Sequence, residues 1–210
     1  MFEVKNKRKR RIIILLFLIV ITTIGGYFAV QNPKIRRFVK RIVYYQTITH
    51  KKFGIKVPTK YSVHGIDVSH HQGSIDWEKV KSMKDEEISL DFAFIKATEG
   101  HSFLDEKFYL NWKNSKKYGI IRGAYHYFSA NIDGLKQANH FIKTVKLKKG
   151  DLPPVIDVEE IGKVSKTKLM SELLKFSKQI ELHYRIKPII YTYHDFYKLN
   201  FDETFKDYKV

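Results

Sequence analysis

Two acidic residues, Asp157 and Glu159, follow an apolar run that starts at Pro153 and has the composition of a β-strand. Successive side chains of a strand point to opposite faces, so both carboxyl groups share one face, roughly 6.6 Å apart along the backbone. Neighbouring carboxylates resist ionising together, so one of them keeps its proton toward neutral pH and can act as an acid. Glycoside hydrolysis is typically catalysed by such a pair of carboxyl groups. The alternative is a solvated strand end whose acids have no chemical role.

The surrounding sequence, residues 61–210, shows a repeated strand–helix pattern that would position the pair. Strands are expected at 63–69, 91–98, 121–128, 155–159 and 188–193, and helices at 75–83, 106–118, 135–146, 166–184 and from 195. This alternation indicates a parallel sheet, either closed as a barrel or open. In a barrel, reactive residues gather at the carboxyl ends of the strands. The residues in such positions are Asp67, Lys96, Asp157, Glu159 and Tyr193.

The basic excess of the chain is concentrated in its first 60 residues. The whole sequence has 39 Lys or Arg against 22 Asp or Glu, a net charge of +17. Residues 1–60 hold 15 of the basic residues and one acid, so residues 61–210 are nearly balanced. We find no nucleic-acid-binding signature in this balanced part, and we expect no nucleic-acid partner. Cysteine is absent, which excludes disulfides and Cys-ligated zinc.

An uncharged run of 19 residues, 12–30, predicts a transmembrane helix. Such a helix would span about 28 Å, close to the hydrocarbon thickness of a bilayer. The basic segment 1–11 would stay in the cytoplasm and place the later domain, 61–210, outside it at the cell membrane. Secretion after signal cleavage is the alternative. Residues 31–60 are expected to form a basic juxtamembrane stalk and linker, with an amphipathic helical stripe over 35–43.

Five motifs of the domain occur in an order and at a spacing that resemble a known family. The motifs are His64–Gly73 with Ile75–Trp77, Phe94–Gly100, Gly123–Phe128, Asp157–Glu159 and Pro188–Thr192. They resemble the lysozymes of glycoside hydrolase family 25, the Chalaropsis-type muramidases, over residues 64–210, about 70% of the chain. The resemblance implies an α/β fold, an irregular TIM-like β/α barrel. It also implies cleavage of the β-1,4 bond between N-acetylmuramic acid and N-acetylglucosamine in peptidoglycan.

Carried onto this sequence, the resemblance implies three catalytic carboxyl groups. Glu159 would be the general acid that protonates the leaving oxygen, and Asp157 would tune its proton affinity or orient the acetamido group of the substrate. Asp67 would complete the cluster. The family is taken to retain the anomeric configuration, and the residues leave open whether an enzyme carboxylate or the N-acetyl oxygen of the substrate attacks. Five further residues are expected to contact the substrate: Lys96, Glu99, Tyr125, Tyr127 and Tyr193.

Several of these residues have a structural alternative. Asp67 could cap the loop after its strand, and Lys96 and Glu99 could pair with each other as part of the scaffold. His70 and His71 lack a third ligand at suitable spacing, so we expect them to structure a loop rather than bind a metal. No cofactor is expected.

The end of the sequence departs from the family pattern. Residues 205–210 resemble the lead-in to a sixth strand, but the Trp-x-Ala-x-Tyr-like motif and the late Asp of relatives are absent. We therefore expect the last strands of the barrel to be missing from this chain, which would leave a sheet edge unpaired. Two functions follow: a membrane-tethered peptidoglycan hydrolase for cell-wall remodelling or lysis, or a catalytically inactive, wall-binding remnant of one.

Overall fold

The chain divides into two compact units, residues 1–62 and residues 63–210. The computed structural model describes residues 27, 31–35, 47–50, 54–58, 61–85 and 88–210. The second unit contains every motif that the sequence analysis identified.

An antiparallel hairpin occupies part of the predicted stalk. Its strands are β1 (Thr47–His50) and β2 (Ile55–Pro58), and Thr47 lies opposite Pro58 in the register. Both strands are rich in β-branched residues, which favour extended backbone. This part of the stalk therefore carries regular secondary structure.

Most of the predicted membrane-proximal sequence lies outside the described residues. This applies to the basic segment 1–11, to the predicted transmembrane helix 12–30 apart from Tyr27, and to the stripe 35–43 apart from Ile35. Among the residues that are described, no helix has both the length and the apolar character needed to cross a membrane.

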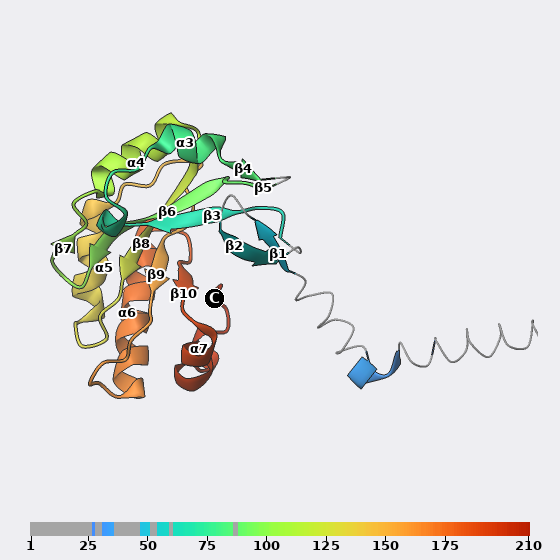
Figure 1. Ribbon diagram of the computed structural model, residues 1–210. Helices are drawn as coiled ribbons and strands as arrows, with labels where there is room; N and C mark the ends of the chain where they lie inside the picture. The colour runs from blue at the N-terminus through green and yellow to red at the C-terminus, as the bar shows by residue number, and fades with distance from the viewer. Residues whose placement is uncertain (1–26, 28–30, 36–46, 51–53, 59–60, 86–87) are drawn as a thin grey trace, which may run out of the picture. The chain divides into compact units, whose positions relative to one another are not determined.

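The second unit is built on a curled parallel β-sheet (Figure 1). The strand order is β10-β9-β8-β6-β3, and each neighbouring pair runs parallel. The strands are β3 (Gly65–Val68), β6 (Phe92–Glu99), β8 (Ile121–Tyr127), β9 (Val155–Asp157) and β10 (Ile189–Tyr191), and the short β7 (Phe103–Leu104) pairs antiparallel with the end of β6. All five predicted strands are confirmed, although β9 ends at Asp157, two residues earlier than predicted.

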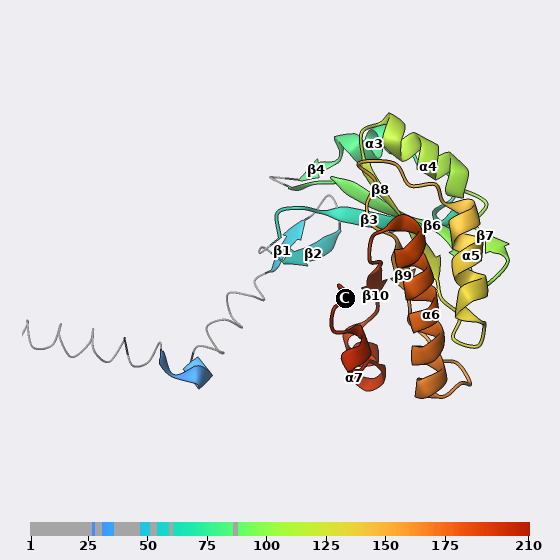
Figure 2. The same ribbon diagram turned by 180° about the vertical axis from the view of Figure 1, so that it is seen from behind.

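The helices that connect successive strands pack along the convex side of the sheet, and a last helix follows β10 (Figures 1 and 2). The helices are α3 (Trp77–Ser82), α4 (Phe108–Lys117), α5 (Gly134–Thr144), α6 (Lys166–Tyr184) and α7 (His194–Asn200). Short 3-10 helices occur at His70–Gln72 and Glu203–Phe205. A small antiparallel hairpin consists of β4 (Lys84–Asp85) and β5 (Ile88–Ser89). The predicted helices are confirmed to within two residues at each predicted end.

Capping side chains set the starts of three helices. Asp76, Asp133 and Ser165 each accept a hydrogen bond, 2.9–3.2 Å long, from the backbone N–H three residues ahead. These contacts satisfy N–H groups that have no partner within the helix. They therefore fix where the loops after β8 and β9 end and the helices α5 and α6 begin.

The main core lies between the sheet and the helices. Alternate strand residues such as Ala93, Ile95 and Ile156 are fully buried, as the two-residue period of a strand requires. They form one apolar cluster with helix residues that include Leu173 and Phe176 of α6. This cluster anchors the strand ends that carry the candidate site.

The concave side of the sheet carries the other set of strand residues. The rings of Phe92 and Phe94 lie so close to Gly65 and Gly123 that a β-carbon at either glycine would collide with them. Only glycine permits this close approach.

The sheet is a half-barrel. In the part of the chain that the structure describes, it is open between its edge strands β3 and β10. Lys209 forms a single parallel bridge to Ile189 of β10, at the place where the sequence predicts the lead-in to a sixth strand. The predicted α/β architecture is thus confirmed as a curled sheet that follows the course of a barrel wall.

Candidate active site

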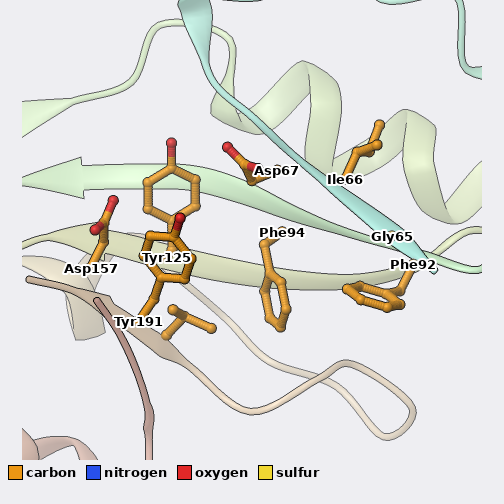
Figure 3. Close-up of a pocket in the computed structure, with 9 residues that line it drawn as sticks. Gly65, Ile66, Asp67, Phe92, Phe94, Tyr125, Asp157 and Tyr191 are labelled. Carbon is orange, nitrogen blue, oxygen red and sulfur yellow. The ribbon is translucent and has the colours of Figure 1, made fainter. Parts of the chain in front are cut away.

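The predicted carboxyl groups gather toward the carboxyl end of the sheet, on its concave side. Asp157 is the last residue of β9, Glu159 follows in the next loop, and Asp67 lies on the edge strand β3. Figure 3 shows Asp67 and Asp157 at one pocket, which has a volume of about 170 Å³. The curl of the sheet brings these residues together although two strands separate them.

Asp157 holds a proton more tightly than an ordinary carboxyl group. Its Oδ1 atom is buried and has no hydrogen-bond partner among the described residues. Burial, and then the negative charges of Glu159 and Asp67, raise the pKa of Asp157 from 3.8 to about 7, while the charge of Lys96 opposes this rise. The sequence predicted that one acid of the pair would keep its proton toward neutral pH, and that acid is Asp157.

Three tyrosines surround Asp157. Tyr127 of β8 and Tyr191 of β10 are its register partners on the two neighbouring strands, and Tyr125 borders the pocket (Figure 3). Burial, followed by the charges of Asp67 and Asp157, raises the pKa of Tyr125, which keeps its hydroxyl group protonated. The sequence analysis missed Tyr191. Its position at the end of an apolar strand was the available signal.

Tyr193 is placed differently from the other predicted tyrosines. Its hydroxyl group donates a 2.9 Å hydrogen bond to the backbone carbonyl of Glu159, and 52% of the residue is exposed. This bond ties the start of α7 to the loop after β9. It therefore helps to hold Glu159 in place.

Lys96 and Glu99 form an ion pair at the end of β6. The Nζ atom of Lys96 lies 2.6 Å from Oε2 of Glu99, and Lys96 is only 7% exposed. A shift in the strand register between Lys96 and Thr98 inserts one residue, which lets side chains three positions apart meet. The same Nζ atom lies 5.0 Å from the centre of the Tyr127 ring. The pairing alternative is thus observed, and the pair adjoins Tyr127, one of the predicted substrate contacts.

His70 pairs with an acid that the sequence analysis did not identify. Its Nδ1 atom lies 2.7 Å from Oδ2 of Asp105, whose side chain is fully buried, and its backbone N–H donates to the same oxygen. The two residues lie 35 positions apart, so no local pattern connected them. The ring centres of His71 and His70 lie 4.0 Å apart, and the rings are tilted by 38°. The pair structures the loop after β3, and across the described residues no cluster of His, Asp or Glu is suited to a metal ion.

Comparisons with known proteins agree with this geometry. The family model for Glycosyl hydrolases family 25 matches residues 66–210. The Escherichia coli K12 protein YegX is 46% identical over 158 residues, and the match covers 75% of this chain and 58% of YegX. The chain thus spans less than two thirds of the length of this relative.

Solved structures of the same kind share the fold. A family 25 glycosyl hydrolase from Bacillus anthracis is 38% identical, with a TM-score of 0.64 over 70% of this chain and 68% of its own. The bacterial lysozyme from Streptomyces coelicolor is 35% identical, with a TM-score of 0.60 over 66% of each chain. The chain described here belongs to Glycosyl hydrolases family 25.

Proposed function

We propose that this protein is a muramidase that hydrolyses the β-1,4 bond between N-acetylmuramic acid and N-acetylglucosamine in peptidoglycan. The observation that carries the proposal is the group of carboxyl groups at the carboxyl end of the sheet, where Asp157 keeps a proton up to about pH 7. Protonation of a leaving glycosidic oxygen needs such a proton, held beside a second carboxyl group. Family membership and the resemblance to a bacterial lysozyme support the choice of substrate.

In this proposal the carboxyl groups divide the chemistry. The Asp157–Glu159 pair supplies the proton, and Glu159 delivers it to the leaving oxygen. Asp157 sets the proton affinity of the pair and, once the proton is on Glu159, can accept a hydrogen bond as a carboxylate from the acetamido N–H of the substrate. The negative charge of Asp67 faces the positive charge that develops on the sugar ring.

The sugar rings are proposed to lie along the tyrosines of the concave side. Tyr125 and Tyr191 border the pocket, and Tyr127 stands level with Asp157. Aromatic faces present large apolar surfaces on which a pyranose ring can stack. Lys96 and Glu99, next to Tyr127, are proposed to contact the hydroxyl groups of the substrate.

The test measures reducing ends released from purified peptidoglycan by the full chain. We expect release by the wild-type protein and a loss of at least about a hundredfold in Glu159→Gln, since a general acid contributes 10²–10⁴-fold. Glu78→Gln, which neutralises an exposed acid on α3, is the matched control and should keep full activity. Equal release by Glu159→Gln would reject the role of that residue. Binding to the wall without any release by the wild type would favour the inactive, wall-binding alternative.

We also propose that the protein is anchored in the cell membrane by residues 12–30, with residues 61–210 on the outer side. The uncharged run and the basic cluster before it support this placement. The full chain should then remain with the membrane fraction after an alkaline wash. Release of a shortened protein into the medium would indicate signal cleavage and secretion instead.

A further inference from the structure

A second pocket lies beside the candidate active site, between the loops that follow β8 and β9. Its volume is about 310 Å³, at the lower end of the range for ligand-binding pockets. One of its lining residues is Tyr127, the register partner of Asp157 on β8. The loop after β9, which holds Glu159, continues directly into the pocket wall at Glu160. The second pocket therefore adjoins the candidate active site at Asp157, where the first pocket reaches the carboxyl end of the sheet.

This pocket combines an apolar base with a charged rim. Phe128 and Ala130 line it and are only 1% and 4% exposed. Glu160 and Lys163 line it as well, and both are exposed. In the part of the chain that the structure describes, neither of these two residues forms an ion pair. The rim thus offers one carboxylate and one ammonium group to a ligand.

We propose that this pocket binds the peptide that N-acetylmuramic acid carries in peptidoglycan, with Lys163 receiving a carboxylate and Glu160 an amino group of that peptide. The inference rests on the proposed function, which places a muramic acid residue at the cleaved bond. Its peptide must then leave the sugar close to Glu159, and Glu160 is the next residue along the chain.

The charges of the rim favour a peptide over a further sugar ring. A wall peptide carries both carboxylate and amino groups, and each would meet an opposite charge at this rim. The sugar rings carry acetamido and hydroxyl groups, which need neither charge, and the lactyl carboxyl group of muramic acid is uncharged where it forms the amide bond to the peptide. The apolar base formed by Phe128 and Ala130 suits the small apolar side chains of such a peptide.

The kinetic test compares two forms of one substrate with the full chain. One form is intact peptidoglycan, and the other is the same material after an amidase has removed its peptides. We expect kcat/KM for the intact form to exceed that for the stripped form by about tenfold, because the intact form makes one or two additional charge-assisted hydrogen bonds with the protein. In Lys163→Ala and Glu160→Gln this ratio should fall toward one, through KM. Lys149→Ala removes an exposed lysine before β9, at the opposite end of that strand, and should keep the wild-type ratio.

A binding measurement separates failure of this inference from failure of the proposed function. The Glu159→Gln chain is titrated with the muropeptide disaccharide, with and without its peptide, in a calorimeter. About tenfold tighter binding of the peptide-bearing form, lost when Lys163→Ala is added, would support the peptide site even if no hydrolysis is detected. Equal affinity for both forms, or a ratio unaffected by Lys163→Ala and Glu160→Gln, would overturn the peptide site while leaving hydrolysis of the glycan untouched.

Discussion

The convex and concave faces of the sheet are made by the same strands but are covered very differently. On the convex face, Ala93 and Ile95 have no exposed surface and belong to one apolar cluster with residues of the helices. On the concave face, Phe92 and Phe94 are only partly buried and Tyr191 is 57% exposed, among the described residues. Because side chains alternate along a strand, one short sequence supplies a closed core on one side and an open surface on the other.

Buried polar groups sharpen this contrast. On the convex face, His126 is fully buried and its ring nitrogens lie 2.8 Å from Thr98 Oγ1 and 3.1 Å from Gln137 Oε1. Burial lowers the pKa of His126 to about 3, so it stays neutral and serves the fold. On the concave face, Asp157 has a buried oxygen with no partner in the described part of the chain. A carboxyl group that has a raised pKa and a buried oxygen without a hydrogen-bond partner, beside a pocket, is typical of a ligand-binding or catalytic site.

The largest effect is expected on the convex face. Phe176 of α6 is 1% exposed and packs on His126 at 4.7 Å and on Phe128 at 5.8 Å. Phe176→Ala would remove this ring and leave a cavity, so we expect a loss of about 3–5 kcal/mol in the free energy of unfolding. Denaturant unfolding of the full chain measures the loss. A change below about 1 kcal/mol would show that the convex core is not the main source of stability.

The same deletion on the concave face should cost less. Phe94 is a phenylalanine like Phe176, but its ring is partly exposed and lines the pocket (Figure 3). Phe94→Ala should therefore lower the free energy of unfolding by about half as much, since less apolar surface returns to water. Equal losses in the free energy of unfolding of the two variants would show that both faces of the sheet contribute equally to stability, contrary to this prediction.

Replacing Asp157 should stabilise the fold at high pH. A carboxyl group whose pKa is raised in the folded state favours the protonated form, so its contribution to stability falls as pH rises from about 4 to about 7. Asp157→Asn cannot acquire this charge. At pH 4 the variant and the wild type should have nearly the same free energy of unfolding. At pH 8 the variant should be more stable by about 1–2 kcal/mol, after allowance for solvent screening, and should melt at a higher temperature. A difference that does not change with pH would contradict the raised pKa.

Much of this arrangement could be predicted from local sequence patterns. The strand period located the ends that carry Asp67, Lys96 and Asp157, because alternation and strand–helix order are encoded over a few residues. The pairing of His70 with Asp105 could not be predicted, since it depends on how distant loops meet. Tyr191 was missed because its level relative to Asp157 depends on the register between strands, which periodicity alone does not define.

The smallest effects, and the most specific, concern the pH dependence of the proposed activity. Hydrolysis should decline as pH rises through the pKa of Asp157, because the carboxyl pair then loses its proton. Asp67→Asn removes a negative charge that raises this pKa, so the alkaline limb should move to lower pH. Lys96→Met removes the opposing positive charge, so the limb should move to higher pH, each by about half a pH unit. Lys149→Ala, remote in the fold, should leave the limb in place. Shifts of the same sign in Asp67→Asn and Lys96→Met would mean that the limb reports another group, and the proton would then have to be sought outside the concave face.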